Sequence, residues 1–280
     1  MPIYKPSELH QFLESLGISP KKGLSQNFLI DGNILRKIVA AANLSKEDVV
    51  IEVGPGPGSL TEELLNSQAH VIAVEKDIVL AKALERLKTE GRQLDIYCDD
   101  IMEFPLEQTL APLLSEGRKA KVVANLPYHL TTPIIAEMVT KTHLFSTLIF
   151  MVQDEVARRF TALPGTSEYS SFTVFLNFYC KPRYAFTVNS TCFYPQPSVN
   201  SAIVVLELKE PPKVSSVEGF FKMTRQAFGK RRKMMRGSLK DLYAPASVEK
   251  SLVEIGHSPL ARPEELSLDE FIILFEKLNN

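Results

Sequence analysis

The stretch "VVIEVGPGPGSLTEELL", residues 49–65, decides the fold of this chain. Its first five residues are typical of a buried strand, and a glycine-rich turn follows at 54–58. Glycine lets the backbone turn sharply and approach a ligand without an intervening side chain. A helical pattern begins at Ser59, which together with Glu62 fits a capping box. Strand, glycine-rich turn and helix in this order predict the first unit of a nucleotide-binding α/β fold.

Apolar runs alternate with helical patterns on both sides of this stretch. Strands are expected at 49–53, 70–75, 94–98, 121–124 and 146–152, and helices at 59–67 and 78–90. Near-continuous apolar strands alternating with helices predict a parallel sheet covered on both faces. Two later runs, 184–188 and 201–208, are expected to add an antiparallel edge. We therefore expect an α/β, Rossmann-like domain on a mostly parallel, seven-stranded sheet.

A break in the pattern divides the chain into two expected domains. Pro211 and Pro212 lie in "KEPPKVSS", a composition typical of a linker. Residues 1–211 would form the catalytic domain that carries the sheet. Residues 212–280 have the pattern of short amphipathic helices and would form a small helical domain.

The composition is that of an ordinary globular protein. Hydrophobic residues make up 45% and charged residues 23% of the chain. No apolar run approaches the roughly 18 residues of a membrane span, and the N-terminus lacks the features of a secretory signal. The chain has three cysteines, Cys98, Cys180 and Cys192. Their odd number and wide spacing argue against a disulfide framework or a zinc site. We expect reduced thiols, no metal and a cytoplasmic, monomeric protein.

The glycine-rich turn favours one class of cofactor. Gly54 and Gly56 begin a G-x-G-x-G pattern, whereas dinucleotide-binding proteins carry G-x-G-x-x-G. Pro55 and Pro57 also lack the backbone N–H groups that a pyrophosphate would need here. Glu75 ends the next strand, where a carboxylate can accept hydrogen bonds from ribose hydroxyls. An adenosine cofactor without phosphates fits best, which predicts S-adenosylmethionine; a tight turn without any ligand is the alternative.

Two further carboxylates are candidates for the same cofactor. Glu52, just before the loop, would face the ammonium group of S-adenosylmethionine. Asp99 or Asp100, in "YCDDIMEF", would accept a hydrogen bond from the adenine amino group, and we favour Asp100. Solvated turn carboxylates are the alternative interpretation of this pair.

The stretch "ANLPYHLTTP", residues 124–133, ends the fourth strand at the same edge of the sheet. The exocyclic amine of a nucleobase is a poor nucleophile because its lone pair is delocalised into the ring. Two acceptors, the side-chain carbonyl of Asn125 and a backbone carbonyl near Pro127, would favour a pyramidal nitrogen and expose that lone pair. Tyr128 offers a ring on which an extruded base can stack. Thr132 and Pro133 are expected to start the next helix. The alternative interpretation of the motif is a turn that ends the strand, with a tyrosine packed for structural reasons only.

At these residues the sequence resembles the KsgA family of small-subunit (16S) ribosomal RNA adenine dimethyltransferases. The resemblance covers nearly the whole chain and includes "LSQNFLID" (24–31), "IEVGPGPGSLTEELL" (51–65), "VEKD" (74–77), "DDIMEF" (99–104), "NLPYHLTTPII" (125–135), "FYPQPSVNSAIV" (193–204) and "FGKRRKMMRGSL" (228–239).

This resemblance implies both an activity and site residues. The activity would be dimethylation on N6 of two adjacent adenosines in the hairpin loop near the 3′ end of 16S rRNA. The substrate would be the small (30S) ribosomal subunit, with a role in subunit biogenesis. Phe193 matches a candidate second aromatic residue beside the target base. The positions matching the family's cofactor contacts are Asn27, Leu29, Gly54, Glu75, Asp100 and Asn125.

A basic stretch follows the linker. Residues 222–240 carry eight Lys or Arg and no acidic residue, although the net charge of the chain is −1. Such a local concentration of positive charge suits RNA phosphates, although a solvated helix face would have the same composition. The densest part, and the predicted RNA-binding set, is Lys230, Arg231, Arg232, Lys233 and Arg236. Met234, Met235 and Gly237 depart from the small polar residues and asparagine that the resemblance leads us to expect.

Three other functions remain possible at this stage. A related class methylates an adenosine of large-subunit (23S) rRNA and confers antibiotic resistance. A mainly non-catalytic ribosome-assembly factor would use the cofactor site without needing Asn125 and Tyr128. A dehydrogenase is disfavoured by the spacing of the glycines.

Overall fold

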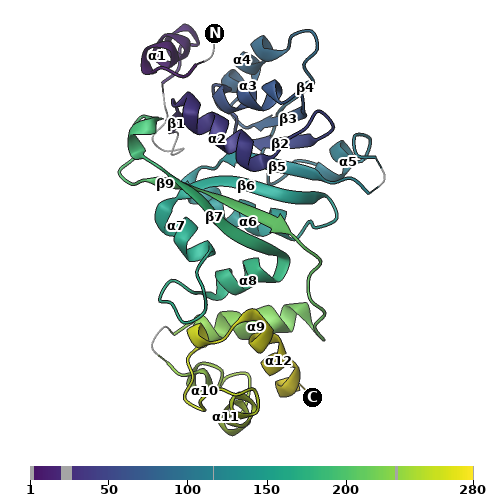
Figure 1. Cartoon of the computed structure of the whole chain (residues 1–280), viewed down its shortest axis with the longest axis vertical. Helices are drawn as coiled ribbons and strands as arrows, with labels where there is room; N and C mark the ends of the chain where they lie inside the picture. The colour runs from purple at the N-terminus through teal and green to yellow at the C-terminus, as the bar shows by residue number, and fades with distance from the viewer. Residues whose placement is uncertain (1–2, 20–26, 116, 231–232, 280) are drawn as a thin grey trace. The chain divides into compact units, whose positions relative to one another are not determined.

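The structure is a computed structural model that describes residues 3–19, 27–115, 117–230 and 233–279. Its central sheet has seven strands in the order β4-β3-β2-β5-β6-β9-β7 (Figure 1). The strands are β2 (Val49–Val53), β3 (His70–Glu75), β4 (Leu94–Cys98), β5 (Ala120–Asn125), β6 (Phe145–Gln153), β7 (Cys180–Val188) and β9 (Ser201–Leu208). β4, β3, β2, β5 and β6 pair in parallel, and β9 pairs antiparallel to β6. The mostly parallel, seven-stranded sheet expected from the sequence is confirmed.

Both faces of the sheet are buried, as the continuous apolar strands predict. Val50 packs in a cluster with Leu35 of α2 (Gly32–Ala42) and Leu64 of α3 (Ser59–Asn66). Its neighbour Ile51 points to the other face and is also fully buried. In Figure 1, α2 crosses in front of the sheet and α6 (Thr131–Val139) lies behind it. Helices on both faces leave the carboxyl ends of the strands as the open edge.

The chain divides into two compact units, Met1–Ala157 with Arg183–Lys209, and Arg158–Pro182 with Glu210–Asn280. The last change of unit along the chain, between Lys209 and Glu210, lies close to the linker expected at 211–212. The expected division is wrong for residues 158–182, which group with the C-terminal helices. The reason is packing: the ring of Phe178 in α8 (Ser171–Tyr179) contacts those of Phe220 and Phe221 in α9 (Val217–Phe228). The other elements of this unit are α10 (Met235–Ser238), α11 (Pro245–Glu254), η5 (Pro263–Glu265) and α12 (Leu268–Asn279), while α7 (Asp154–Phe160) crosses the boundary.

Two details predicted for helix starts are wrong: the capping box at Ser59 and the first helical position for Pro133. α3 begins at Ser59, as expected, but the Ser59 hydroxyl donates to the carbonyl of Ile3, at 3.0 Å, and no side chain caps the helix. α6 begins at Thr131, after the short helix η3 (Tyr128–Leu130), so Pro133 occupies its third position. The helix expected at 78–90 is α4 (Ile78–Ala83), followed by η2 (Leu84–Leu87).

The N-terminal lead is folded against the first unit. α1 (Pro6–Ser15) contributes Leu9 and Leu13 to an apolar cluster that includes Phe28 and Leu80. The two-residue strand β1 (Phe28–Leu29) pairs antiparallel with β8 (Phe193–Tyr194). The remaining short elements are α5 (Leu106–Leu110) and η4 (Ser190–Cys192). Among the described residues, no helix has the length and apolar character needed to cross a membrane.

Candidate cofactor and base site

A cleft with a cavity volume of about 480 Å³ lies in the first unit, outside the carboxyl ends of β2, β3, β4 and β5. Its size is within the usual range for small-ligand sites. Eight of the residues expected at a site line this one cleft: Asn27, Gly54, Gly56, Glu75, Asp100, Asn125, Pro127 and Tyr128. The parallel strands explain this convergence, since their carboxyl ends meet at one edge of the sheet.

Glu75 is held rigidly at the end of β3. One carboxylate oxygen accepts the backbone N–H of Gly56 at 2.9 Å, and the other accepts that of Asp77 at 2.9 Å. The side chain is buried, and this burial raises the pKa of Glu75 above its ordinary value. Each oxygen keeps a lone pair for a further donor. The carboxylate is therefore fixed in place to accept a pair of neighbouring hydroxyl groups.

The glycine loop adopts the conformation that its composition demands. Gly54 has φ of +63°, and a Cβ atom built there would meet nothing within 4 Å. Gly54 lines the cleft, so this open space belongs to the cavity. The guanidinium of Arg86 supports the loop from outside by donating to the carbonyl of Pro57 at 2.8 Å. The backbone is thus open on the cleft side and anchored on the other.

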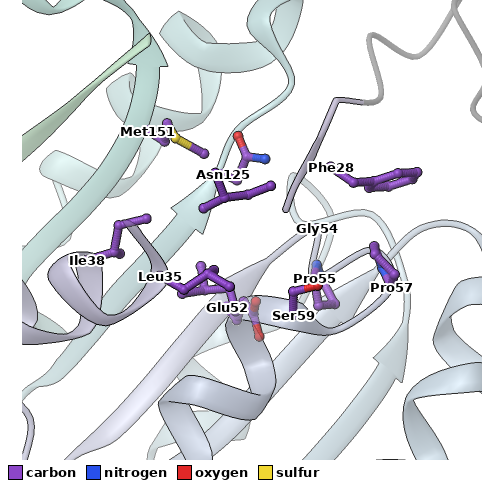
Figure 2. Close-up of a pocket in the computed structure, with 12 residues that line it drawn as sticks. Phe28, Leu35, Ile38, Glu52, Gly54, Pro55, Pro57, Ser59, Asn125 and Met151 are labelled. Atoms are coloured by element: carbon purple, nitrogen blue, oxygen red, sulfur yellow. The ribbon is translucent and has the colours of Figure 1, made fainter. Parts of the chain in front are cut away.

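A second, smaller cavity of about 40 Å³ shares Phe28, Gly54 and Asn125 with the cleft. Leu29 lines this small cavity rather than the cleft. Figure 2 shows Glu52 between Leu35 and Ser59, with Asn125 on the opposite wall.

Glu52 is a buried acid without a full set of partners. It is 1% exposed, and its Oε2 atom has no hydrogen-bond partner among the described residues. Burial, with a smaller contribution from the charge of Glu75, raises the pKa of Glu52 to about 8. An unsatisfied buried carboxyl is costly, and here it points to a cationic or hydrogen-bonding ligand.

Asp100 and Asp99 play different roles in the turn after β4. Asp99 accepts the backbone N–H of Asp100 at 2.7 Å and so stabilises the turn itself. Asp100 accepts the ammonium of Lys76 at 2.7 Å and the N–H of Met102 at 3.0 Å. The Lys76 ammonium is the main reason that the pKa of Asp100 lies below its ordinary value. Both aspartates line the cleft, and Asp100 is the one that pairs with a cationic side chain, that of Lys76.

Asn125 is oriented by the N-terminal segment. Its Nδ2 donates to the backbone carbonyl of Asn27 at 3.1 Å. A backbone carbonyl can only accept, so the side-chain nitrogen must face it and the Oδ1 atom must face elsewhere. The side-chain carbonyl of Asn125 is therefore left as an acceptor at the cleft.

The second acceptor, expected at a backbone carbonyl near Pro127, is not the carbonyl of Pro127 itself. The carbonyl of Pro127 already accepts the N–H of Leu130 at 3.0 Å and the hydroxyl of Thr131 at 3.2 Å. A carbonyl oxygen has two lone pairs, so Pro127 has none left for a substrate. Leu126 also lines the cleft, and its carbonyl accepts none of the hydrogen bonds found among the described residues. The Leu126 carbonyl is thus the open backbone acceptor of this turn.

Tyr128 lines the cleft, and its hydroxyl lies 2.9 Å from the hydroxyl of Ser201. Burial raises the pKa of Tyr128, so its phenol stays neutral at ordinary pH.

Phe193 does not line the cleft, unlike the other expected aromatic residue. It is 3% exposed and packs in the core behind β1, opposite Leu29. Its position serves the strand pair rather than a ligand surface.

Several cleft residues escaped the sequence analysis. Phe28, Lys76, Met102, Leu126 and His129 all line the cavity. Phe28 lies between two expected contacts in "QNFL", and a closer look at that motif could have found it. Leu126 gave no signal, because every residue carries a carbonyl and only the fold decides which one stays open.

The predicted RNA-binding residues belong to the second unit. Lys230 and Lys233 are exposed, whereas Arg236 forms an ion pair with Glu249 of α11. Arg231 and Arg232 lie outside the described residues. Met235 is fully buried in the core of this unit, which explains why an apolar residue stands within the basic stretch.

Comparison with known proteins gives consistent matches over the whole length. The family model "Ribosomal RNA adenine dimethylase" matches residues 18–280. "Ribosomal RNA small subunit methyltransferase A" of Protochlamydia amoebophila is 62% identical over 278 residues, covering 99% of this chain and 98% of its own. The protein of the same name from Chlamydia felis is 46% identical over 279 residues, covering 98% and 95%.

Two solved structures share the fold over most of the chain. The 23S rRNA methyltransferase ErmE is 25% identical with a TM-score of 0.70 and covers 91% of this chain and 100% of its own. A dimethyladenosine transferase from Plasmodium falciparum is 25% identical with a TM-score of 0.71 and covers 88% and 95%.

Proposed function

Because the chain belongs to the ribosomal RNA adenine dimethylase family, we propose that it dimethylates two adjacent adenosines on N6 near the 3′ end of 16S rRNA. The protein is an S-adenosylmethionine-dependent methyltransferase that acts on adenine in ribosomal RNA. The choice of the small subunit is supported by the relative of 62% identity that carries this substrate in its name. The 23S rRNA enzyme ErmE is similar at only 25% identity. A role in small-subunit biogenesis is part of the same proposal.

The observation that carries the proposal is the orientation of Asn125. Its amide nitrogen is held by the carbonyl of Asn27, so its oxygen is presented at the cleft beside Tyr128. An open amide oxygen next to an aromatic ring is the combination that an extruded adenine requires: an acceptor for the amine and a surface for the base.

The residues of the cleft fit S-adenosylmethionine. Glu75 would accept the ribose hydroxyls, and the open side of Gly54 would let the cofactor approach the backbone. Asp100 would accept the adenine amino group. Glu52, with its unpartnered Oε2 in the small cavity, would face the cationic ammonium group. When bound, the cofactor supplies a methyl group on a sulfonium, a leaving group that needs no general acid.

The chain's own contribution to the chemistry is orientation and polarisation of the target amine. The Oδ1 atom of Asn125 and the carbonyl of Leu126 would accept the two hydrogens of N6. Hydrogen bonds to these two oxygens favour a pyramidal nitrogen, whose lone pair then points out of the ring plane. Tyr128 would hold the base in this position by stacking. Preorganised acceptors of this kind act without moving during the reaction.

Binding of the rRNA is assigned to the basic stretch of the second unit. Lys230 and Lys233 are exposed and so can reach phosphates. A hairpin loop suits the site because its bases are already partly unstacked, which lowers the cost of extruding one of them.

The test is methyl transfer from labelled S-adenosylmethionine to three acceptors: undermethylated small subunits, large subunits and duplex DNA. The proposal requires label as N6,N6-dimethyladenosine in 16S rRNA alone. Label in the large subunit would move the substrate to 23S rRNA while keeping the chemistry. Binding to small subunits without any label would favour a non-catalytic assembly factor.

A further inference from the structure

The hydroxyl of Tyr128 has a fixed partner. Its oxygen lies 2.9 Å from the Oγ atom of Ser201, although the two residues are 73 positions apart in the sequence. Tyr128 belongs to the short helix η3 that follows β5, whereas Ser201 is the first residue of β9. Ser201 is 0% exposed, so its hydroxyl has few alternatives to this contact.

Ser201 is itself held in place by the sheet. It lies opposite Gln153 in the antiparallel pair of β9 and β6. The preceding carbonyl, that of Asn200, accepts the backbone N–H of Asp154 at 3.0 Å. The side chain of Asn200 accepts the N–H of Ser190 at 3.0 Å. Ser201 therefore presents its hydroxyl from one of the most firmly anchored positions next to the cleft.

The hydrogen bond restrains the part of Tyr128 that matters for stacking. The phenolic oxygen lies on the long axis of the ring, so anchoring this atom fixes the direction in which the ring points. η3 is only three residues long and supplies little rigidity of its own. Without the contact, Tyr128 could change rotamer and tilt its face away from the base.

We propose that Ser201 is a positioning residue for the target adenine, keeping the Tyr128 ring pointed along the direction in which an extruded base can stack on it. This inference rests on the proposed function of the cleft. It gives a role to Ser201 of "FYPQPSVNSAIV", a motif that begins at Phe193 in the core and brings Ser201 to the hydroxyl of Tyr128.

The test is a double-mutant cycle of Ser201→Ala and Tyr128→Phe, measured as kcat and KM on small subunits. Each variant loses one hydroxyl and keeps the ring. A neutral hydrogen bond of this kind predicts that each single change lowers kcat/KM by about three- to tenfold. The double variant should be no worse than either single one, because both remove the same contact. Affinity for S-adenosylhomocysteine should stay unchanged.

A second measurement reads the stacking directly. 2-Aminopurine placed at the target position of reconstituted small subunits has no N6 amine to methylate, and its fluorescence falls when it stacks on an aromatic ring. Quenching on binding should be strong with the wild type and weaker with Ser201→Ala. Ser146→Ala is the matched control. Ser146 lies at the opposite end of β6 from Gln153, and its hydroxyl donates to the carbonyl of Ala120. This variant should leave kcat/KM and quenching unchanged.

The outcomes separate the two levels of the proposal. Multiplicative losses in the cycle, or undiminished quenching with Ser201→Ala, would overturn the role of Ser201 while an active wild type upholds the proposed function. A wild type that methylates no rRNA would overturn the proposed function itself.

Discussion

The side-chain nitrogen of Asn125 donates a hydrogen bond to the backbone carbonyl of Asn27, at 3.1 Å and across 98 positions of sequence. This contact joins the end of β5 to the segment just before β1. Both residues line the cleft, and the bond decides which end of the Asn125 amide is available to a ligand. The N-terminal segment thereby takes part in orienting the acceptor of the target amine.

Replacement of Asn125 by Ala should abolish most of the methyl transfer. Loss of one preorganised polar group in an active site typically lowers kcat by about 10²–10³, and we expect a loss in this range. Binding to small subunits should change by less than about twofold, because the phosphate contacts are made elsewhere. Single-turnover rates and filter binding would measure the two effects. The control is Asn66→Ala, a change at an exposed position of α3. Equal losses of rate and of subunit binding for Asn125→Ala would contradict the separation of chemistry from RNA binding.

Replacement of Gly54 by Ala should weaken cofactor binding beyond its effect on stability. Both Gly54 and Gly256 have positive φ, +63° and +88°, and neither has a neighbour that would meet an added Cβ. Alanine at either position should cost about 1–2 kcal/mol of unfolding free energy. Gly54 is one of the residues that line the cleft, and Gly256 is not. Titration with S-adenosylhomocysteine should show at least tenfold weaker binding for Gly54→Ala and none of this loss for Gly256→Ala.

Glu52 should make the stability of the ligand-free protein fall as the pH rises. In the unfolded chain this acid ionises near its ordinary pKa of 4.5, whereas burial raises its pKa to about 8 in the folded protein. Between these values the folded state holds a proton that the unfolded state has lost. The unfolding free energy should therefore decrease by up to about 1.4 kcal/mol per pH unit across this window and level off above it. Denaturant titrations of the wild type and Glu52→Gln would measure this contribution.

Glu52→Gln should remove that slope and gain stability relative to the wild type above pH 8. The same group should make S-adenosylmethionine bind more tightly as the pH rises toward 8, because the ammonium favours an ionised partner. If the cofactor affinity of Glu52→Gln depended on pH as strongly as that of the wild type, the placement of the ammonium in the small cavity would be contradicted.

Lys76→Met should weaken cofactor binding moderately. The Lys76 ammonium holds Asp100 at 2.7 Å, although Lys76 itself is largely exposed. Without it the Asp100 side chain keeps the N–H of Met102 as a hydrogen-bond donor and should sample more positions. We expect affinity for S-adenosylhomocysteine to fall by about two- to fivefold, in line with an exposed ion pair. The control is Lys88→Met, which removes a similar surface ion pair with Glu85 and should leave the affinity unchanged. An unchanged affinity for Lys76→Met as well would contradict a contact between Asp100 and the cofactor.

Removal of Lys230 and Lys233 should weaken binding to small subunits and reduce its salt dependence. Each phosphate contact contributes close to one unit to the slope of log K against log salt, so the double Ala variant should lower the slope by about 1–2. The matched control is the double Ala variant at Lys250 and Lys277, which removes the same charge from the same unit. Equal slopes for both double variants would mean that the predicted RNA-binding set is merely a solvated face.

The sequence by itself determined the parts of this protein that follow from local pattern. Apolar strands alternating with helices required a parallel sheet, and a parallel sheet brings Gly54, Glu75, Asp100 and Asn125 to one edge. Local patterns predicted helix caps less well. Ser59 is of a residue type that often caps a helix, but its hydroxyl donates to the carbonyl of Ile3, 56 positions away.

The tertiary structure alone decided which atoms of the site are open. The turn after β5 contains several carbonyls, and only the fold shows that Pro127 is occupied by Leu130 and Thr131 while Leu126 is not. Likewise, only the fold places Phe193 in the core and brings Ser201 to Tyr128. The physical reason is that composition and periodicity specify which face of a strand or helix is buried. The assignment of individual hydrogen bonds depends on partners that the folded chain brings together from distant positions.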